Sequence, residues 1–122
     1  MPYKIQEIDG FVEVSVWGET SKWEMLEAVW ELRLRDPCKK VSDLWIVSGE
    51  CMVHFDEFPE IAEAVQSLCT PGMIGSKSAI VASDELQRAQ LELYRAEAAI
   101  LPFEIRVFRS RDDAVRWLKS SE

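Results

Sequence analysis

Two elements of secondary structure follow each other directly in the segment Pro102-Phe103-Glu104-Ile105-Arg106-Val107-Phe108-Arg109-Ser110-Arg111-Asp112-Asp113-Ala114-Val115-Arg116-Trp117-Leu118. Its first half alternates apolar and charged residues behind a proline, which is typical of a half-buried strand. In its second half Ser110 precedes Asp113 by three residues, close to a capping box, and the apolar residues that follow share one helical face. The chain is therefore expected to end in a strand, a tight turn and an amphipathic helix.

The same two periodicities alternate along the rest of the chain. Strand patterns cover 3–8 and 11–17, joined by a hairpin turn at Asp9-Gly10, and short apolar runs at 43–48 and 78–82 predict buried strands. Helices are predicted from Ser21 to residue 35, from Asp56 or Phe58 to the break at Pro71-Gly72, and from Ser83 or Asp84 to about Leu101.

Each long helix pattern carries a candidate core stripe. In the first helix the stripe is Trp23, Leu26, Trp30 and Leu34, widened by Met25, Val29 and Leu32. In the third helix the stripe is Leu86, Ala89, Leu93, Ala96 and Ile100. Residues at this spacing lie on one side of a helix, so we expect both stripes to face the sheet. In the second strand we expect Val12, Val14 and Val16 to face the core.

This order of elements predicts an α/β fold. The order is β-β-α-β-α-β-α-β-α, and strands that alternate with helices form parallel sheets through right-handed crossovers. The opening hairpin adds one antiparallel strand. We therefore expect one domain, residues 1–122, with a five-stranded mixed sheet and four helices. No linker-like segment or internal repeat divides the chain.

Composition argues against several classes of partner. The formal net charge is −8, and residues 41–76 contain six acidic residues and no Lys or Arg. Nucleic acids and anionic membrane surfaces are bound through Lys and Arg, so neither is an expected partner. No apolar run reaches the roughly 20 residues that span a bilayer. The N-terminus lacks a signal-peptide pattern, and three separated cysteines do not suggest a disulfide framework, so we expect a cytoplasmic protein.

The element order and three segments carry a resemblance to a known family: Trp17-Gly18-Glu19-Thr20, Asp43-Leu44-Trp45-Ile46-Val47, and the ending from Val107 to Leu118. On these features the chain resembles the STAS fold, and more closely the stand-alone bacterial SpoIIAA-like (STAS/SEC14-like) group. The resemblance implies a partner-binding role, which in anti-sigma-factor antagonists is switched by phosphorylation after the third strand. Here no Ser or Thr lies between Cys51 and Ile61, so the chain departs from that pattern. The SEC14-like side of the resemblance implies a pocket for a lipophilic ligand.

The segment after the third strand is the candidate functional region. It is unusually apolar for a connection, and ligands of open α/β sheets collect beyond the carboxyl ends of the strands. We therefore expect a non-catalytic binding module that engages a protein partner or a small apolar ligand, with a homodimer as the candidate assembly. The predicted binding residues, with His54 as the polar anchor, are Trp45, Ser48, Met52, His54 and Phe55.

An alternative is a small hydrolase or transferase that uses Cys51 as nucleophile. His54 would accept the thiol proton, and Asp56 or Glu57 would orient the imidazole. Catalytic triads are normally assembled from distant segments, which disfavours three neighbours in one loop. The chain lacks zinc-finger spacing and His-Glu-x-x-His, so neither a metal nor another cofactor is expected.

Overall fold

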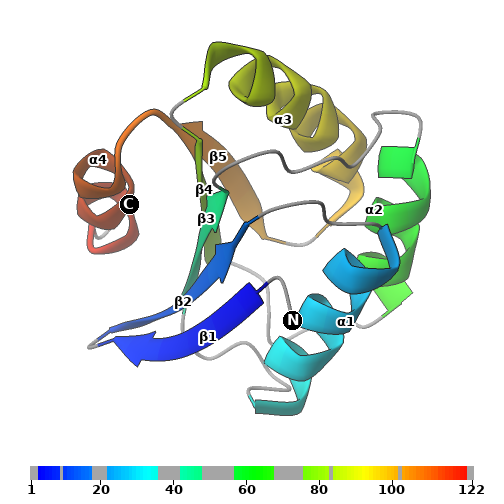
Figure 1. Cartoon of the computed structure of the whole chain (residues 1–122), viewed down its shortest axis with the longest axis horizontal. Helices are drawn as coiled ribbons and strands as arrows, with labels where there is room; N and C mark the ends of the chain where they lie inside the picture. Colours follow the sequence, from blue (N-terminus) through cyan, green and yellow to red (C-terminus); the bar gives the residue numbers. More distant parts are fainter. Residues whose placement is uncertain are drawn as a thin grey trace.

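A computed structural model of the chain describes residues 3–8, 10–17, 22–35, 42–47, 57–67, 76–82, 84–101 and 103–120 (Figure 1). The strands are β1 (Tyr3–Ile8), β2 (Phe11–Val16), β3 (Ser42–Val47), β4 (Lys77–Ala82) and β5 (Glu104–Phe108). The helices are α1 (Lys22–Arg35), α2 (Phe58–Ser67), α3 (Glu85–Glu97) with a 3-10 turn at Ala98–Ile100, and α4 (Arg111–Leu118). None of the helices in these ranges is long and apolar enough to cross a membrane.

The predicted fold class is confirmed for the described residues. They form an α/β structure with one five-stranded mixed sheet and four helices, in the predicted order. The strands lie in the spatial order β1-β2-β3-β4-β5. Strand β1 pairs antiparallel with β2 across the hairpin, and the other neighbours are parallel. Gly10 in the hairpin turn has a φ of 93°, a conformation that favours glycine.

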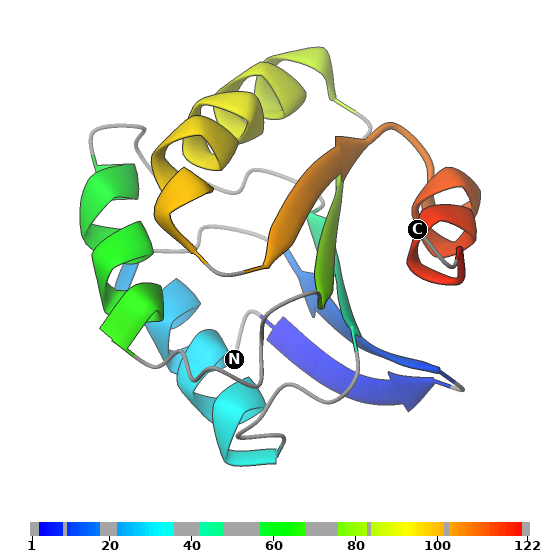
Figure 2. The same ribbon diagram turned by 180° about the vertical axis from the view of Figure 1, so that it is seen from behind.

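The helices form two layers of unequal size around the sheet. Helices α1, α2 and α3 lie on one face, and α4 lies alone on the other (Figures 1 and 2). Strands β2 to β5 are added in sequence order in one direction. Right-handed connections along such a sheet put every connecting helix on the same face. Helix α4 follows the last strand, so no crossover constrains it.

Strand β3 is covered on both faces, as its apolar run predicts. Leu44 is fully buried beneath α4, in a cluster that includes Ala79 of β4 and Ala114 of α4. The start of α4 is also confirmed, since the Ser110 hydroxyl accepts a hydrogen bond from the Asp113 amide at 3.3 Å. On the other face, Trp45 of β3 packs against a second cluster, which contains Val14 of β2 and lies beneath α1. The central strand therefore anchors both layers.

The predicted core stripe of α1 is confirmed in part. Val29 and Leu32 are buried, and Leu26 and Met25 are partly buried against the core, but the other three residues of the stripe are not. Trp23, Trp30 and Leu34 are 70%, 54% and 68% exposed, whereas Ala28 and Leu32 pack on the valine face of β2. Apolar residues lie on both sides of this helix, so the 3.6-residue period alone does not identify the inner side. The sheet is covered by the side with the smaller residues, and the tryptophan side faces outward.

The predicted stripe of α3 is wrong for a similar reason. Leu86, Leu93 and Ile100 are 69%, 53% and 51% exposed. The inner side instead presents Leu91 and Tyr94, which pack against the cluster beneath the helix and are only half-buried. No residue of Glu85–Glu97 is buried. Helix α3 thus covers the sheet loosely, and this leaves space beneath it.

The phenol of Tyr3 in β1 forms hydrogen bonds with α1. Its hydroxyl donates to Glu31 Oε2 at 2.6 Å and lies 3.3 Å from Glu27 Oε1. Burial, followed by the hydrogen bond and charge of Glu31 and then by Glu27, raises the pKa of Tyr3 above its usual value. The protonated phenol is therefore favoured in the folded state.

We expect Tyr3 to make the protein less stable at alkaline pH. Above about pH 10 the unfolded chain loses the phenol proton while the folded state retains it, so the free energy of unfolding falls as pH rises. Tyr3→Phe removes this titration and should flatten the decline. Urea unfolding curves between about pH 8 and 11 measure how the free energy of unfolding changes with pH, because that range spans the unperturbed tyrosine pKa. If the free energy of unfolding falls equally with pH in the wild type and in Tyr3→Phe, Tyr3 is not the group responsible.

Candidate functional site

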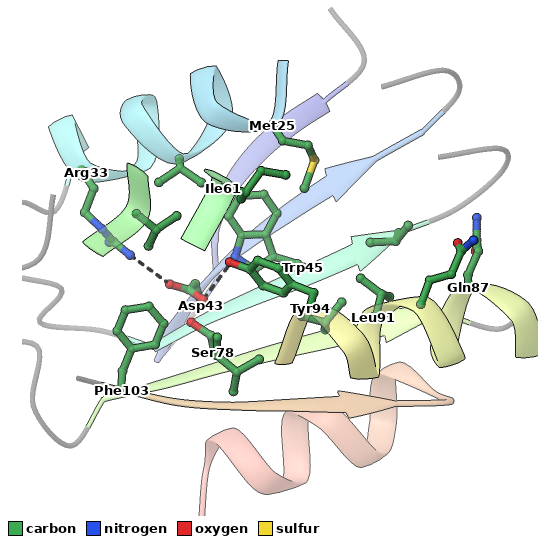
Figure 3. A pocket seen from close by; sticks show the side chains of 16 residues that line it. Met25, Arg33, Asp43, Trp45, Ile61, Ser78, Gln87, Leu91, Tyr94 and Phe103 are labelled. Atoms are coloured by element: carbon green, nitrogen blue, oxygen red, sulfur yellow. Dashed lines mark hydrogen bonds and ion pairs between the residues drawn. The ribbon is translucent and has the colours of Figure 1, made fainter. Parts of the chain in front are cut away.

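The space beneath α3 is a cavity of about 100 Å³ between the sheet and helices α1, α2 and α3 (Figure 3). Its lining is mainly apolar. The sheet contributes Asp43, Trp45, Val47, Ser78, Ile80 and Ile105. The helices and the segment before β5 contribute Met25, Val29, Arg33, Ile61, Val65, Gln87, Gln90, Leu91, Tyr94 and Phe103.

Strand register produces the floor of the pocket. Asp43 is paired with Ser78, and two residues further along each strand Trp45 is paired with Ile80. Because side chains two residues apart in a strand point to the same face, both pairs face α1, α2 and α3. The floor therefore has one polar row next to one apolar row.

Helical spacing produces the wall opposite Trp45. Met25, Val29 and Arg33 follow one another at intervals of four residues in α1, and such residues lie above one another on a helix. Ile61 and Val65 of α2 have the same spacing. Two apolar positions and one cationic position of α1 thus reach the same cavity.

A buried ion pair occupies one end of the pocket. A guanidinium nitrogen of Arg33 lies 3.7 Å from Asp43 Oδ2, and the two side chains are 8% and 3% exposed. The Trp45 indole Nε1–H donates to Asp43 Oδ1 at 3.2 Å. Figure 3 shows Arg33, Asp43 and Ser78 gathered at this end, with Gln87 at the other. The pocket therefore has the ion pair at one end, the uncharged polar side chain of Gln87 at the other, and mainly apolar side chains between them.

Of the predicted binding residues, the structure describes Trp45, which lines the pocket. Its role in binding stays a prediction. Ser48, Met52, His54 and Phe55 lie outside the described residues, so their roles stay predictions. The same holds for Cys51 and the alternative chemistry that pairs it with His54. Val47, the last residue of β3, lines the pocket, so the predicted segment follows directly in sequence from a pocket residue.

The sequence prediction missed the polar end of the pocket. From the sequence, Asp43 belongs to an apolar strand and to the acidic stretch 41–76. A carboxylate in a buried strand is itself a signal, because buried charges are paired. Arg33 lies four residues after Val29 and one after Leu32, which would identify it as the partner once the inner side of α1 is known. Neither the side of the helix nor the pairing can be read from periodicity.

The arrangement can bind an apolar molecule and orient it by hydrogen bonds at one end. Among the described residues, no group of three or more His, Cys, Asp or Glu side chains is placed to hold a metal ion. No protein-family model matches the chain, and neither a curated protein nor a solved structure is significantly similar to it.

Proposed function

We propose that the protein is a non-catalytic binding module for a small, mainly apolar molecule. The observation that carries this proposal is the cavity of about 100 Å³ beneath α3, lined by Trp45 and a majority of apolar side chains. Apolar cavities with a few polar groups are the usual form of small-molecule sites; this one is smaller than the roughly 300–1,000 Å³ of sites for drug-sized ligands, so it suits a very small molecule. The predicted resemblance to the SpoIIAA-like (STAS/SEC14-like) group points to the same kind of ligand.

A hydrocarbon probe tests this function. Methylenecyclopentane is an uncharged, compact hydrocarbon without a strong hydrogen-bond acceptor, and it is similar in size to benzene, which a cavity of roughly 150 Å³ accommodates. We expect it to shift the NMR resonance of the Trp45 indole Nε1–H in a saturable titration, because that group lies at the pocket floor. If the Trp45 resonance does not move even in a solution saturated with methylenecyclopentane, the proposed function is contradicted.

Filling the pocket should abolish this binding. Leu91 of α3 lines the cavity, whereas Leu93 of the same helix is 53% exposed on the outer side. We expect Leu91→Trp to weaken methylenecyclopentane binding at least about tenfold, because the indole occupies the space of the probe. Leu93→Trp is the matched control and should bind as the wild type does. Equal affinities of the two variants would contradict the assignment of the pocket.

A second role, self-association through α1, is favoured by its outward tryptophans. Trp30 and Leu34 are 54% and 68% exposed, and Trp is among the residues that most often dominate interfaces. The first turn of α1 carries Glu24 and its last turn carries Arg35. In a two-fold dimer with antiparallel α1 helices, the acidic end of each helix meets the basic end of the other. We propose that a second copy of this chain covers this side.

Sedimentation equilibrium tests the self-association. The wild type should form a dimer, and Trp30→Glu should raise its dissociation constant at least about tenfold, since truncating a central interface aromatic costs about 2 kcal/mol or more. Leu86→Glu, on the exposed side of α3, is the control and should leave the dimer intact. A wild type that sediments as a monomer throughout, or a dimer lost only in Leu86→Glu, would refute the proposed interface.

A further inference from the structure

The pocket contains a buried hydrogen-bond donor without an acceptor. Arg33 is 92% buried, and its Nε atom has no hydrogen-bond partner within the described part of the chain. Buried donors are normally satisfied, because leaving one unpaired forfeits its hydration without replacement, and the penalty is greater for a charged group. Arg33 lines the cavity, so a molecule bound there can supply the missing acceptor.

The position of Arg33 determines how such a molecule lies. Arg33, Asp43 and Ser78 are together at one end, and Leu91 and Gln87 are toward the other (Figure 3). Gln87 is only half-buried, so water can reach it, whereas the guanidinium is nearly enclosed. A bound molecule with one polar end is therefore expected to direct that end toward Arg33.

The charges at this end favour an uncharged ligand. Arg33 and Asp43 form an ion pair and neutralise each other, and the Trp45 indole already donates to the Asp43 carboxylate. An anionic ligand would add a second negative charge beside Asp43 in a poorly hydrated site, where unpaired charge is unfavourable. A neutral carbonyl oxygen accepts from Arg33 Nε without changing the net charge.

We propose that the ligand is a small uncharged molecule with an apolar body and one carbonyl oxygen, and that this oxygen accepts a hydrogen bond from Arg33 Nε. The inference rests on the proposed function, since it requires that the pocket bind a ligand. It adds the class of ligand, its orientation and the residue that selects it.

Three probes of similar size separate the ligand classes. Cyclopentanone carries the carbonyl, methylenecyclopentane has the same shape without a strong acceptor, and cyclobutanecarboxylate is anionic. We expect the wild type to prefer cyclopentanone over methylenecyclopentane roughly tenfold, the effect of one hydrogen bond to a charged group. The Arg33 Nε–H resonance should move downfield with cyclopentanone only. Affinities are measured by NMR titration of the Trp45 indole Nε1–H.

Variants at the polar end test the role of Arg33. The double variant Arg33→Met with Asp43→Leu removes both charges, and replacing a whole buried pair by apolar residues is often tolerated. It should no longer prefer cyclopentanone, because the carbonyl oxygen would be desolvated without a donor. Arg35→Met changes an arginine of the same helix whose side chain is 45% exposed, and it should keep the wild-type preference.

The outcomes distinguish this inference from the proposed function. If the wild type binds methylenecyclopentane as tightly as cyclopentanone, the carbonyl inference is overturned while the binding function stands. Tightest binding of cyclobutanecarboxylate would also overturn it, in favour of an anionic ligand. If no probe shifts the Trp45 resonance, both fail. Because these three results come from the wild type, they hold even if a variant does not fold.

Discussion

Asp43→Leu is expected to lower the free energy of unfolding by about 3–5 kcal/mol, the cost of removing one partner of a buried ion pair. Arg33 would remain 92% buried without the carboxylate that lies 3.7 Å from it. The Trp45 indole would also lose its acceptor. Since domains of this kind are stable by about 5–15 kcal/mol, the variant should be close to unfolding.

Urea unfolding followed by circular dichroism measures this loss. The double variant Arg33→Met with Asp43→Leu is the matched control, and it should be far more stable than Asp43→Leu because no unpaired charge remains. The interaction energy between the two positions is obtained from the full double-mutant cycle, including Arg33→Met. Simple additivity of the two single substitutions would show that the side chains are not coupled, which would contradict the observed pair.

Leu32→Ala is expected to destabilise the protein by about 2–5 kcal/mol, whereas Leu34→Ala should change its stability by less than about 0.5 kcal/mol. Leu32 lies on the inner side of α1 and is 2% exposed, whereas Leu34 in the same helix is 68% exposed. The loss at Leu32 combines the removed apolar contacts with the cavity left behind. The two substitutions have the same chemistry and nearly the same helix position, so their difference reports burial.

This pair of variants tests which side of α1 faces the sheet. Both are measured by urea unfolding at a protein concentration low enough to avoid self-association. The predicted stripe includes Leu34 and is widened by Leu32, so it would require both substitutions to destabilise the protein. A larger loss in Leu34→Ala than in Leu32→Ala would show that α1 packs through its tryptophan side.

The fold was predictable because its signals are local. The hairpin at Gly10, the continuous apolar run of β3 and the cap at Ser110 each depend on residues close in sequence. Within the described residues, Trp45 is the pocket residue that the sequence also indicates as a candidate for binding. The polar end of the pocket joins Arg33 of α1 to Asp43 of β3, and no local pattern shows that these two side chains meet.

Local chemistry alone was enough to establish the order of strands and helices, the single antiparallel hairpin and the capped α4, because period, turn residues and caps act within a few residues. Tertiary structure decided which side of each helix faces the sheet, because α1 and α3 carry apolar residues on more than one side. It also decided the pocket, because the space beneath α3 depends on how strand register and three helices meet. Packing is a property of elements distant in the chain, so periodicity within one element cannot reveal it.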